Sequence, residues 1–177
     1  MAKTIGIIPE KIINYRCFVD GEMSPSALVD VDLPDIQYMS ETISGAGIAG
    51  EIDSPTLGHF SALEIGLNLR TLIKKDFSLF SQKVYALEFR AATQSTDMVN
   101  GTINKGRLKV SARVVPKSMA LGKLEVGKPS GSNQKFACHY LKVEVDGETV
   151  LEIDKINMIF NVNGTDLLAE VRDAMGM

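Results

Sequence analysis

The stretch KGRLKVSARVV, residues 105–115, alternates polar residues with glycine or apolar residues as far as Val114. A repeat of two residues is typical of a β-strand, because successive side chains point to opposite faces of the sheet. The stretch therefore predicts a half-buried strand with a strongly basic outer face. The polar side chains on that face are Lys105, Arg107, Lys109, Ser111 and Arg113.

The same alternation recurs in segments 27–33, 61–69 and 84–91, each of which predicts a strand. Segment 136–154 predicts a long hairpin that turns at Asp146-Gly147, since Asp-Gly suits a two-residue hairpin turn. A second Asp-Gly, at residues 20–21, predicts another hairpin that joins 14–21 to 27–33.

Helical spacing of apolar residues predicts two short helices, at 71–80 and 165–176. Two stretches rich in Gly, Ser and Pro are expected to be long loops, at about 34–60 and 116–134. We find no internal repeat and no domain boundary, so residues 1–177 are expected to form a single domain. The predicted fold is mainly β: an antiparallel β-sandwich or open barrel with one or two short flanking α-helices.

Composition is that of a globular protein, with 45% hydrophobic and 23% charged residues and a net charge of −3. Nothing in it indicates a signal peptide, and no apolar run is long enough for a membrane anchor, so we expect a protein of the cytosol. Cys17 and Cys138 lie far apart and predict two buried free thiols. Charge is uneven, because residues 105–142 contain nine Lys and Arg but one acid, Glu125.

The stretch SGAGIAGE, residues 44–51, contains the G-x-G-x-x-G spacing of dinucleotide-binding folds. That motif must follow a buried strand, open a helix and precede an acidic residue by about 20 positions. Here Pro55 and Gly58 disfavour a helix, and Arg70 stands near the position where the acid is needed. We therefore expect a loop that binds no cofactor.

Candidate catalytic groups are scarce. The two histidines, His59 and His139, have no partner at a motif spacing, and Cys138 and His139 would point to opposite faces of one strand. Residues 101–108 approach a phosphate-binding loop, but Arg107 and Leu108 replace its Lys and hydroxyl. The acidic side chains of hairpin 136–154 are interpreted as a solvated face and not as a metal site. We expect no enzyme, no cofactor and no metal.

Three interpretations of the basic strand face remain open. It is a solvated edge that discourages aggregation, a surface complementary to an acidic partner, or a phosphate-contacting surface for nucleic acid. The last comes third, because few aromatic residues lie between the cations.

The last part of the chain, residues 139–177, resembles the major tail tube protein family of contractile-tailed bacteriophages and phage-tail-like bacteriocins. The resemblance is carried by the Asp-Gly hairpin, by LEIDKINM at 151–158 and VNGTDLL at 162–168, and by the short helix that ends at Gly176. Upstream, the order of strands and of the glycine loop agrees more loosely. Residues 1–12 and 116–134 have no counterpart that we can match.

This resemblance implies a β-sandwich subunit that forms hexameric rings, which stack into the tube inside a contractile sheath. The implied partners are further copies of the chain, the sheath protein, and the baseplate and tail terminator proteins. In a phage, DNA passes through the lumen without sequence-specific binding. The implied location is the tail of a virion or phage-tail-like particle that is assembled in the bacterial cytoplasm.

Two surfaces are predicted to serve this assembly. Loop 40–58 and the N-terminus are expected to contact the next ring, and the basic strand face is expected to meet a partner or line the lumen. The alternatives are the tube of a type VI secretion-like system and, from another class, a monomeric ligand-binding β-sandwich. The loop residues are Ile43, Gly45, Gly47, Ile48, Gly50 and Glu51; the face residues are Lys105, Arg107, Lys109 and Arg113.

Overall fold

The computed structural model describes residues 6–23 and 28–177. It is dominated by strands, and two short helices accompany them. The elements are β1 (Ile7–Val19), β2 (Glu22–Met23), β3 (Leu28–Asp32), β4 (Tyr38–Ile43), β5 (Ile52–Phe60), β6 (Leu63–Leu69), α1 (Lys74–Ser78), β7 (Tyr85–Asp97), β8 (Thr102–Ala120), β9 (Ser132–Val145), β10 (Glu148–Asp154), β11 (Ile159–Val162), β12 (Thr165–Asp166) and α2 (Ala169–Ala174).

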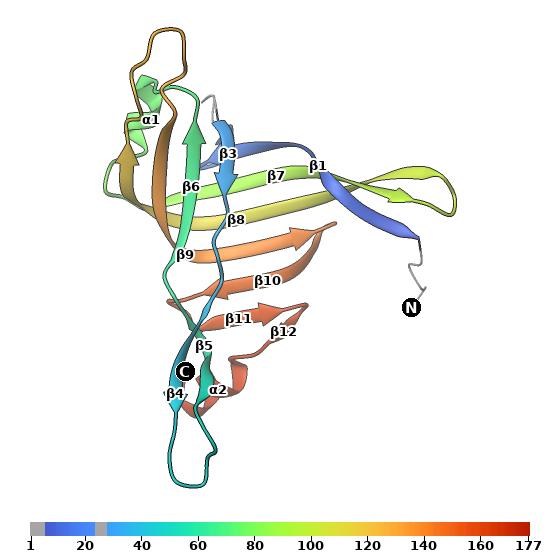
Figure 1. Cartoon of the computed structure of the whole chain (residues 1–177), viewed down its shortest axis with the longest axis vertical. Helices are drawn as coiled ribbons and strands as arrows, with labels where there is room; N and C mark the ends of the chain where they lie inside the picture. The colour runs from blue at the N-terminus through green and yellow to red at the C-terminus, as the bar shows by residue number, and fades with distance from the viewer. Residues whose placement is uncertain (1–5, 24–27) are drawn as a thin grey trace.

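The main sheet is antiparallel, in the order β12-β11-β10-β9-β8-β7-β1-β2. Strand β9 is shared between two layers. One edge of β9 pairs with β8 along most of its length, while the other pairs with β6 over residues 132–138 and with β10 over 140–145. Strand β3 then extends the second layer from β6. Figure 1 shows β6 and β3 running across the strands of the main sheet, as in an open sandwich.

The core lies between these layers. Alternate residues of β6, β7 and β8 face it, as the two-residue period predicted, and Ile65 and Val114 are fully buried. Each large apolar side chain buried in this way stabilises the fold by about 1.5–3 kcal/mol. The aliphatic and aromatic residues of these three strands that are buried in the core are Leu63, Ile65, Leu67, Leu69, Tyr85, Leu87, Phe89, Val110, Ala112 and Val114.

The predicted fold class is confirmed, with antiparallel sheets and two short helices. The hairpin at Asp146-Gly147 is also confirmed. Both residues have the positive φ that a tight turn of this kind requires, 52° and 92°.

The second predicted hairpin is wrong in its partner. The Asp20-Gly21 turn joins β1 to the two-residue strand β2, whereas β3 pairs with β6, far along the sequence. Because β3 is the edge of its layer and a register shift interrupts it, Val29 and Leu33 are about half exposed and not buried. Ala27, the first residue of the predicted strand, lies outside the described residues.

The segment 34–60, expected to be a long loop, forms the hairpin β4-β5 with a tip at 44–51. Figure 1 shows this hairpin projecting from the lower end of the molecule. A hairpin surrounded by solvent has no buried face, so its sequence lacks the alternation that marks the other strands. The loop expected at 116–134 is shorter, 121–131, because β8 and β9 continue into it.

Both helices are shorter than predicted at both ends, and carboxylates lie where they begin. Asp76 accepts a hydrogen bond from the backbone N–H of Ile73 at 2.9 Å, next to the start of α1. Asp166 accepts one from the backbone N–H of Leu168 at 3.0 Å, so α2 begins only at residue 169. Leu168 is buried, whereas Leu167 and Met175 are exposed.

Candidate assembly surfaces

Hairpin β4-β5 is anchored at its root and free at its tip. The rings of Tyr38 and Phe60 lie 5.1 Å apart, and Phe60 meets Phe160 of β11 edge-on at 4.9 Å. Gly58 lies directly against Leu168, with no room for a side chain between them. The root is therefore part of the core, and it fixes the direction in which the arm projects.

The predicted contact loop lies at the tip of this arm. Gly47 and Gly50 adopt positive φ, 93° and 123°, while Gly45 does not. Ile43 is 47% exposed and pairs with Ile52, which is 52% exposed. The other predicted residues also lie in the tip: Ile48 is half-buried and Glu51 is exposed. Residues 1–5 of the N-terminus, the second predicted contact, lie outside the described residues.

The predicted basic face does form one side of β8, but acids from neighbouring strands partly neutralise it. The Lys109 ammonium lies 3.3 Å from a carboxylate oxygen of Glu88 on β7 and 3.2 Å from one of Glu144 on β9. These hydrogen bonds, the one to Glu144 most of all, raise the pKa of Lys109. Periodicity along one strand cannot reveal such partners, because they come from the adjacent strands.

The other three cations of the face make no ion pair with any residue that the structure describes. The Arg113 guanidinium lies 5.7 Å from the ring centre of Tyr140 on β9. Lys105 and Arg107 are exposed further along β8. The free positive charge is thus at the two ends of the face and not at its middle.

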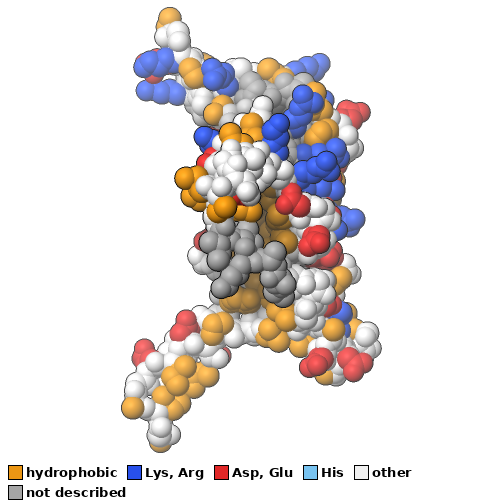
Figure 2. Space-filling model, turned by 90° about the vertical axis from the view of Figure 1, so that its right-hand side faces the viewer, with side chains coloured by type: hydrophobic (Ala, Val, Ile, Leu, Met, Phe, Trp, Pro, Cys, Tyr) orange, Lys and Arg blue, Asp and Glu red, His pale blue; other side chains and the backbone are white. Residues whose placement is uncertain are grey.

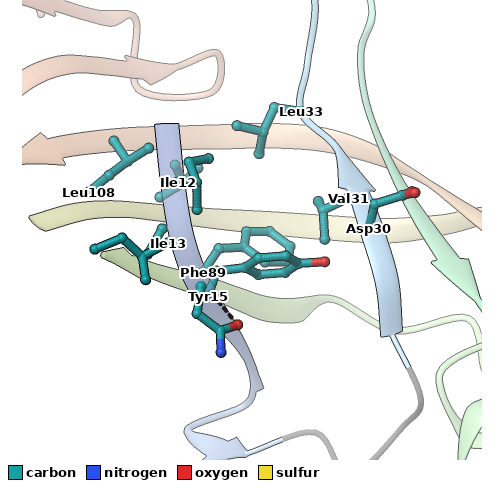
Figure 3. Close-up of a pocket in the computed structure, with 11 residues that line it drawn as sticks. Ile12, Ile13, Tyr15, Asp30, Val31, Leu33, Phe89 and Leu108 are labelled. Atoms are coloured by element: carbon teal, nitrogen blue, oxygen red, sulfur yellow. Dashed lines mark hydrogen bonds between the residues drawn. The ribbon is translucent and has the colours of Figure 1, made fainter. Parts of the chain in front are cut away.

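An apolar groove of about 410 Å³ opens between β1 and β3, and sequence reasoning missed it. Figure 3 shows Tyr15 and Phe89 at its centre, with Ile12 of β1 and Leu33, next to β3, at its rim. The Tyr15 hydroxyl donates to the carbonyl of Val29 at 3.2 Å, which ties the two sides together. Ile12 and Ile13 are 54% and 50% exposed, although they line an apolar surface.

The far end of β1, β7 and β8 also exposes apolar side chains. This end projects to the right in Figure 1, beyond the second layer that covers the rest of the sheet. Exposed apolar side chains that lie together make this end a candidate contact surface. The exposed residues at this end are Ile7, Ile8, Met98, Val99 and Ile103.

Reactive chemistry has little support among the described residues. Burial raises the pKa of Cys17 to about 12, and burial, opposed by Lys155 and by a backbone hydrogen bond with Tyr140, raises that of Cys138 to about 11. Both thiols are free, as predicted, and neutral at pH 7. No group of three His, Cys, Asp or Glu side chains suited to a metal occurs in this part of the chain. None of its helices is long and apolar enough to span a membrane.

Charge is segregated along the long axis of the molecule. Figure 2 shows acidic and apolar side chains on the projecting lower arm, whereas Lys and Arg gather towards the upper end. No Lys or Arg occurs in the sequence between Arg16 and Arg70, a span that includes the whole arm.

The comparisons with known proteins agree on one family. The family described as phage tail tube protein FII matches residues 9–176. The tail tube protein of Escherichia phage P2 is 25% identical over 174 residues, which cover 96% of this chain and 99% of the relative.

Two solved structures are similar to this chain at low identity, and the first of them shares its fold. One is described as the sheath/tube terminator of an extracellular contractile injection system, PVC, in its extended state. The match has a TM-score of 0.50 and 13% identity, and it covers 77% of this chain and 97% of the terminator chain. The other is from the sheath-tube complex of that system. The match has a TM-score of 0.48 and 12% identity, and it covers 80% of this chain and 93% of the other chain. Because the family matches residues 9–176, nearly the whole of this chain, the chain belongs to the phage tail tube protein FII family.

Proposed function

We propose that this protein is the structural subunit of the inner tube of a contractile tail or tail-like particle. Six copies form a ring, and rings stack into a hollow tube that is driven through the target envelope. The observation that carries this proposal is the family match over residues 9–176. Its role is structural, without enzymatic activity or cofactor.

Contacts within the ring are proposed to cover the apolar groove and the projecting end of β1, β7 and β8. In the isolated chain these surfaces expose Ile12, Ile13, Val99 and Ile103, the last two by 73% and 62%. Strands β3 and β2 are also edges with unpaired backbone groups on one side. A neighbouring copy that covers both features would remove apolar area from water and satisfy an open strand edge.

Contacts between rings are proposed to use the tip of hairpin β4-β5, as the sequence predicted for loop 40–58. Support comes from the projection of the arm beyond the body of the subunit and from the exposure of Ile43 and Ile52. The free cations of the basic face, Lys105, Arg107 and Arg113, are proposed to meet an acidic surface of a partner or to line the lumen.

The proposed partners are other copies of the chain, the sheath protein, and the baseplate and tail terminator proteins. DNA would pass through the lumen without sequence-specific contacts if the particle is a phage. Assembly is proposed to take place in the bacterial cytoplasm. The type VI-like alternative shares the same subunit architecture, but the match to the phage tube family favours the phage branch.

Electron microscopy of the purified chain tests the proposal, together with light scattering over a range of concentrations and ionic strengths. Rings or tubes are expected, and their formation should increase with protein concentration. Monodisperse monomers under every condition would refute the tube function and favour a monomeric ligand-binding module, for which the apolar groove would be the site.

A further inference from the structure

The loop between β8 and β9, residues 121–131, has no role in the contacts proposed so far. It projects from the end of the molecule opposite to hairpin β4-β5, as Figure 1 shows. Leu124 and Val126 at its tip are 98% and 101% exposed, more than the other large apolar side chains that the structure describes. Neighbouring apolar side chains that are exposed together make the tip a candidate contact site.

The loop is built to hold this tip in place. The backbone N–H of Lys123 donates to the carbonyl of Ser130 at 2.8 Å, and that of Lys128 donates to the carbonyl of Glu125 at 3.2 Å. Gly122 has positive φ and lies so close to the Ser130 carbonyl that a side chain would not fit between them. These contacts close the loop on itself, so Leu124 and Val126 are presented by a defined turn.

The surroundings of the loop are basic. Lys128 pairs with Glu125 at 2.6 Å, while Lys123 has no ion pair among the described residues. At the base of the loop, Lys117 and Lys135 share one acid, Glu64, at 2.6 Å and 2.8 Å. Two cations on one carboxylate leave a net positive charge. Helix α1, which carries two further lysines, lies at the same end (Figure 1).

The arm at the opposite end has the complementary character. Residues 34–60 contain four acids and neither Lys nor Arg. Glu51 and Asp53 flank Ile52 at the tip, and neither acid makes an ion pair with a described residue. Each end thus combines exposed apolar side chains with unneutralised charge, and the two charges are opposite.

We infer that loop 121–131 of one copy receives the tip of hairpin β4-β5 from the next copy along the tube, an inference that rests on the proposed tube function. Ile43 and Ile52 would cover Leu124 and Val126, while the acids of the arm face the lysines of the loop. The two surfaces lie at opposite ends of one molecule, so the contact is head-to-tail. A contact of this type extends into a filament, as stacking along a tube requires.

A charge exchange tests the pairing. One variant carries Glu51→Lys with Asp53→Lys, a second carries Lys123→Glu with Lys128→Glu, and a third combines all four changes. Each double variant should lose tubes in electron micrographs, because like charges then face each other across the contact. The combined variant should restore tubes, since opposite charges meet again. Circular dichroism and thermal unfolding show that each variant is folded.

The control reverses an exposed acid away from both ends, Glu148→Lys at the start of β10, and should leave tube formation unchanged. If the wild-type chain forms no tubes, the proposed function fails and this inference with it. If wild-type tubes form, the inference alone is overturned by either of two results. One is that either double variant still forms tubes, including loop-variant tubes that fail only to bind sheath; the other is that the folded combined variant does not restore tubes.

Discussion

Gly58→Ala is expected to destabilise the subunit at the root of its projecting arm. Gly58 has a φ of +69°, and a Cβ added there would lie 2.5 Å and 2.6 Å from the two terminal methyl carbons of Leu168. Leu168 is only 3% exposed and packs in the core, so its side chain has little space in which to move away.

Two costs add at this position. The left-handed backbone costs a residue with a side chain about 1–2 kcal/mol. Forcing one extra carbon into a packed core costs about 1–3 kcal/mol more. The free energy of unfolding should therefore fall by roughly 2–5 kcal/mol, which leaves most domains of this kind folded.

Gly101→Ala separates the two costs. Gly101 has nearly the same φ, +65°, but a Cβ there would meet nothing within 4 Å. This control should lose only the backbone contribution, about 1–2 kcal/mol. The difference between the two variants then measures the clash with Leu168.

Urea unfolding of both variants and the wild type provides the measurement. It should be made at a concentration at which the chain is monomeric, because assembly would stabilise the folded state by mass action. Gly58→Ala should also cost less in a Leu168→Ala background, where the clash is gone. Equal losses for Gly58→Ala and Gly101→Ala would refute the reasoning, since the close approach to Leu168 would then have no energetic consequence.

Three further predictions follow from the surfaces and from α2. Replacing tip residues 44–51 by a two-residue Asn-Gly turn should leave thermal unfolding nearly unchanged but abolish tubes in micrographs; normal tubes would exclude the tip from the contact between rings. Arg107→Glu with Lys109→Glu should reduce assembly or sheath binding, whereas no effect on either would show that the basic face is merely solvated. The hydrogen bond from Arg172 holds the pKa of Asp166 below its usual range. This carboxylate therefore contributes stability above about pH 4 that is lost as the pH falls through its folded-state pKa. The difference in unfolding free energy between wild type and Asp166→Asn should shrink below that pH, and a constant difference would contradict the assignment.

The strands that could be predicted from sequence are those with one face on the core. In β6, β7 and β8, alternate residues such as Ile65, Leu87 and Val110 are buried while their neighbours face outward. The two-residue period appears in the sequence because every second side chain of these strands points into the core. The turn at Asp146-Gly147 could be predicted as well, because its positive φ angles restrict the choice of residue.

The rest depends on contacts that are distant in sequence. Strand β3 pairs with β6 and not with β1, and no residue near Asp20-Gly21 indicates which of the two strands it pairs with. The arm β4-β5 has solvent on both faces, so nothing in its pattern distinguishes it from a loop. The acids that neutralise Lys109 come from the strands on either side of β8. The groove of Tyr15 and Phe89 likewise arises only when β1 and β3 come together.

Strand β9 has a mechanical consequence. It pairs with β8 along one edge and divides its other edge between β6 and β10, so both layers are bonded to the same backbone. Neither layer can swing against the other without breaking hydrogen bonds of β9. The subunit thus lacks a hinge between its two layers, and a force applied at one end reaches the other through a continuous ladder. A tube that is pushed from one end resists buckling only if each of its subunits is stiff in this way.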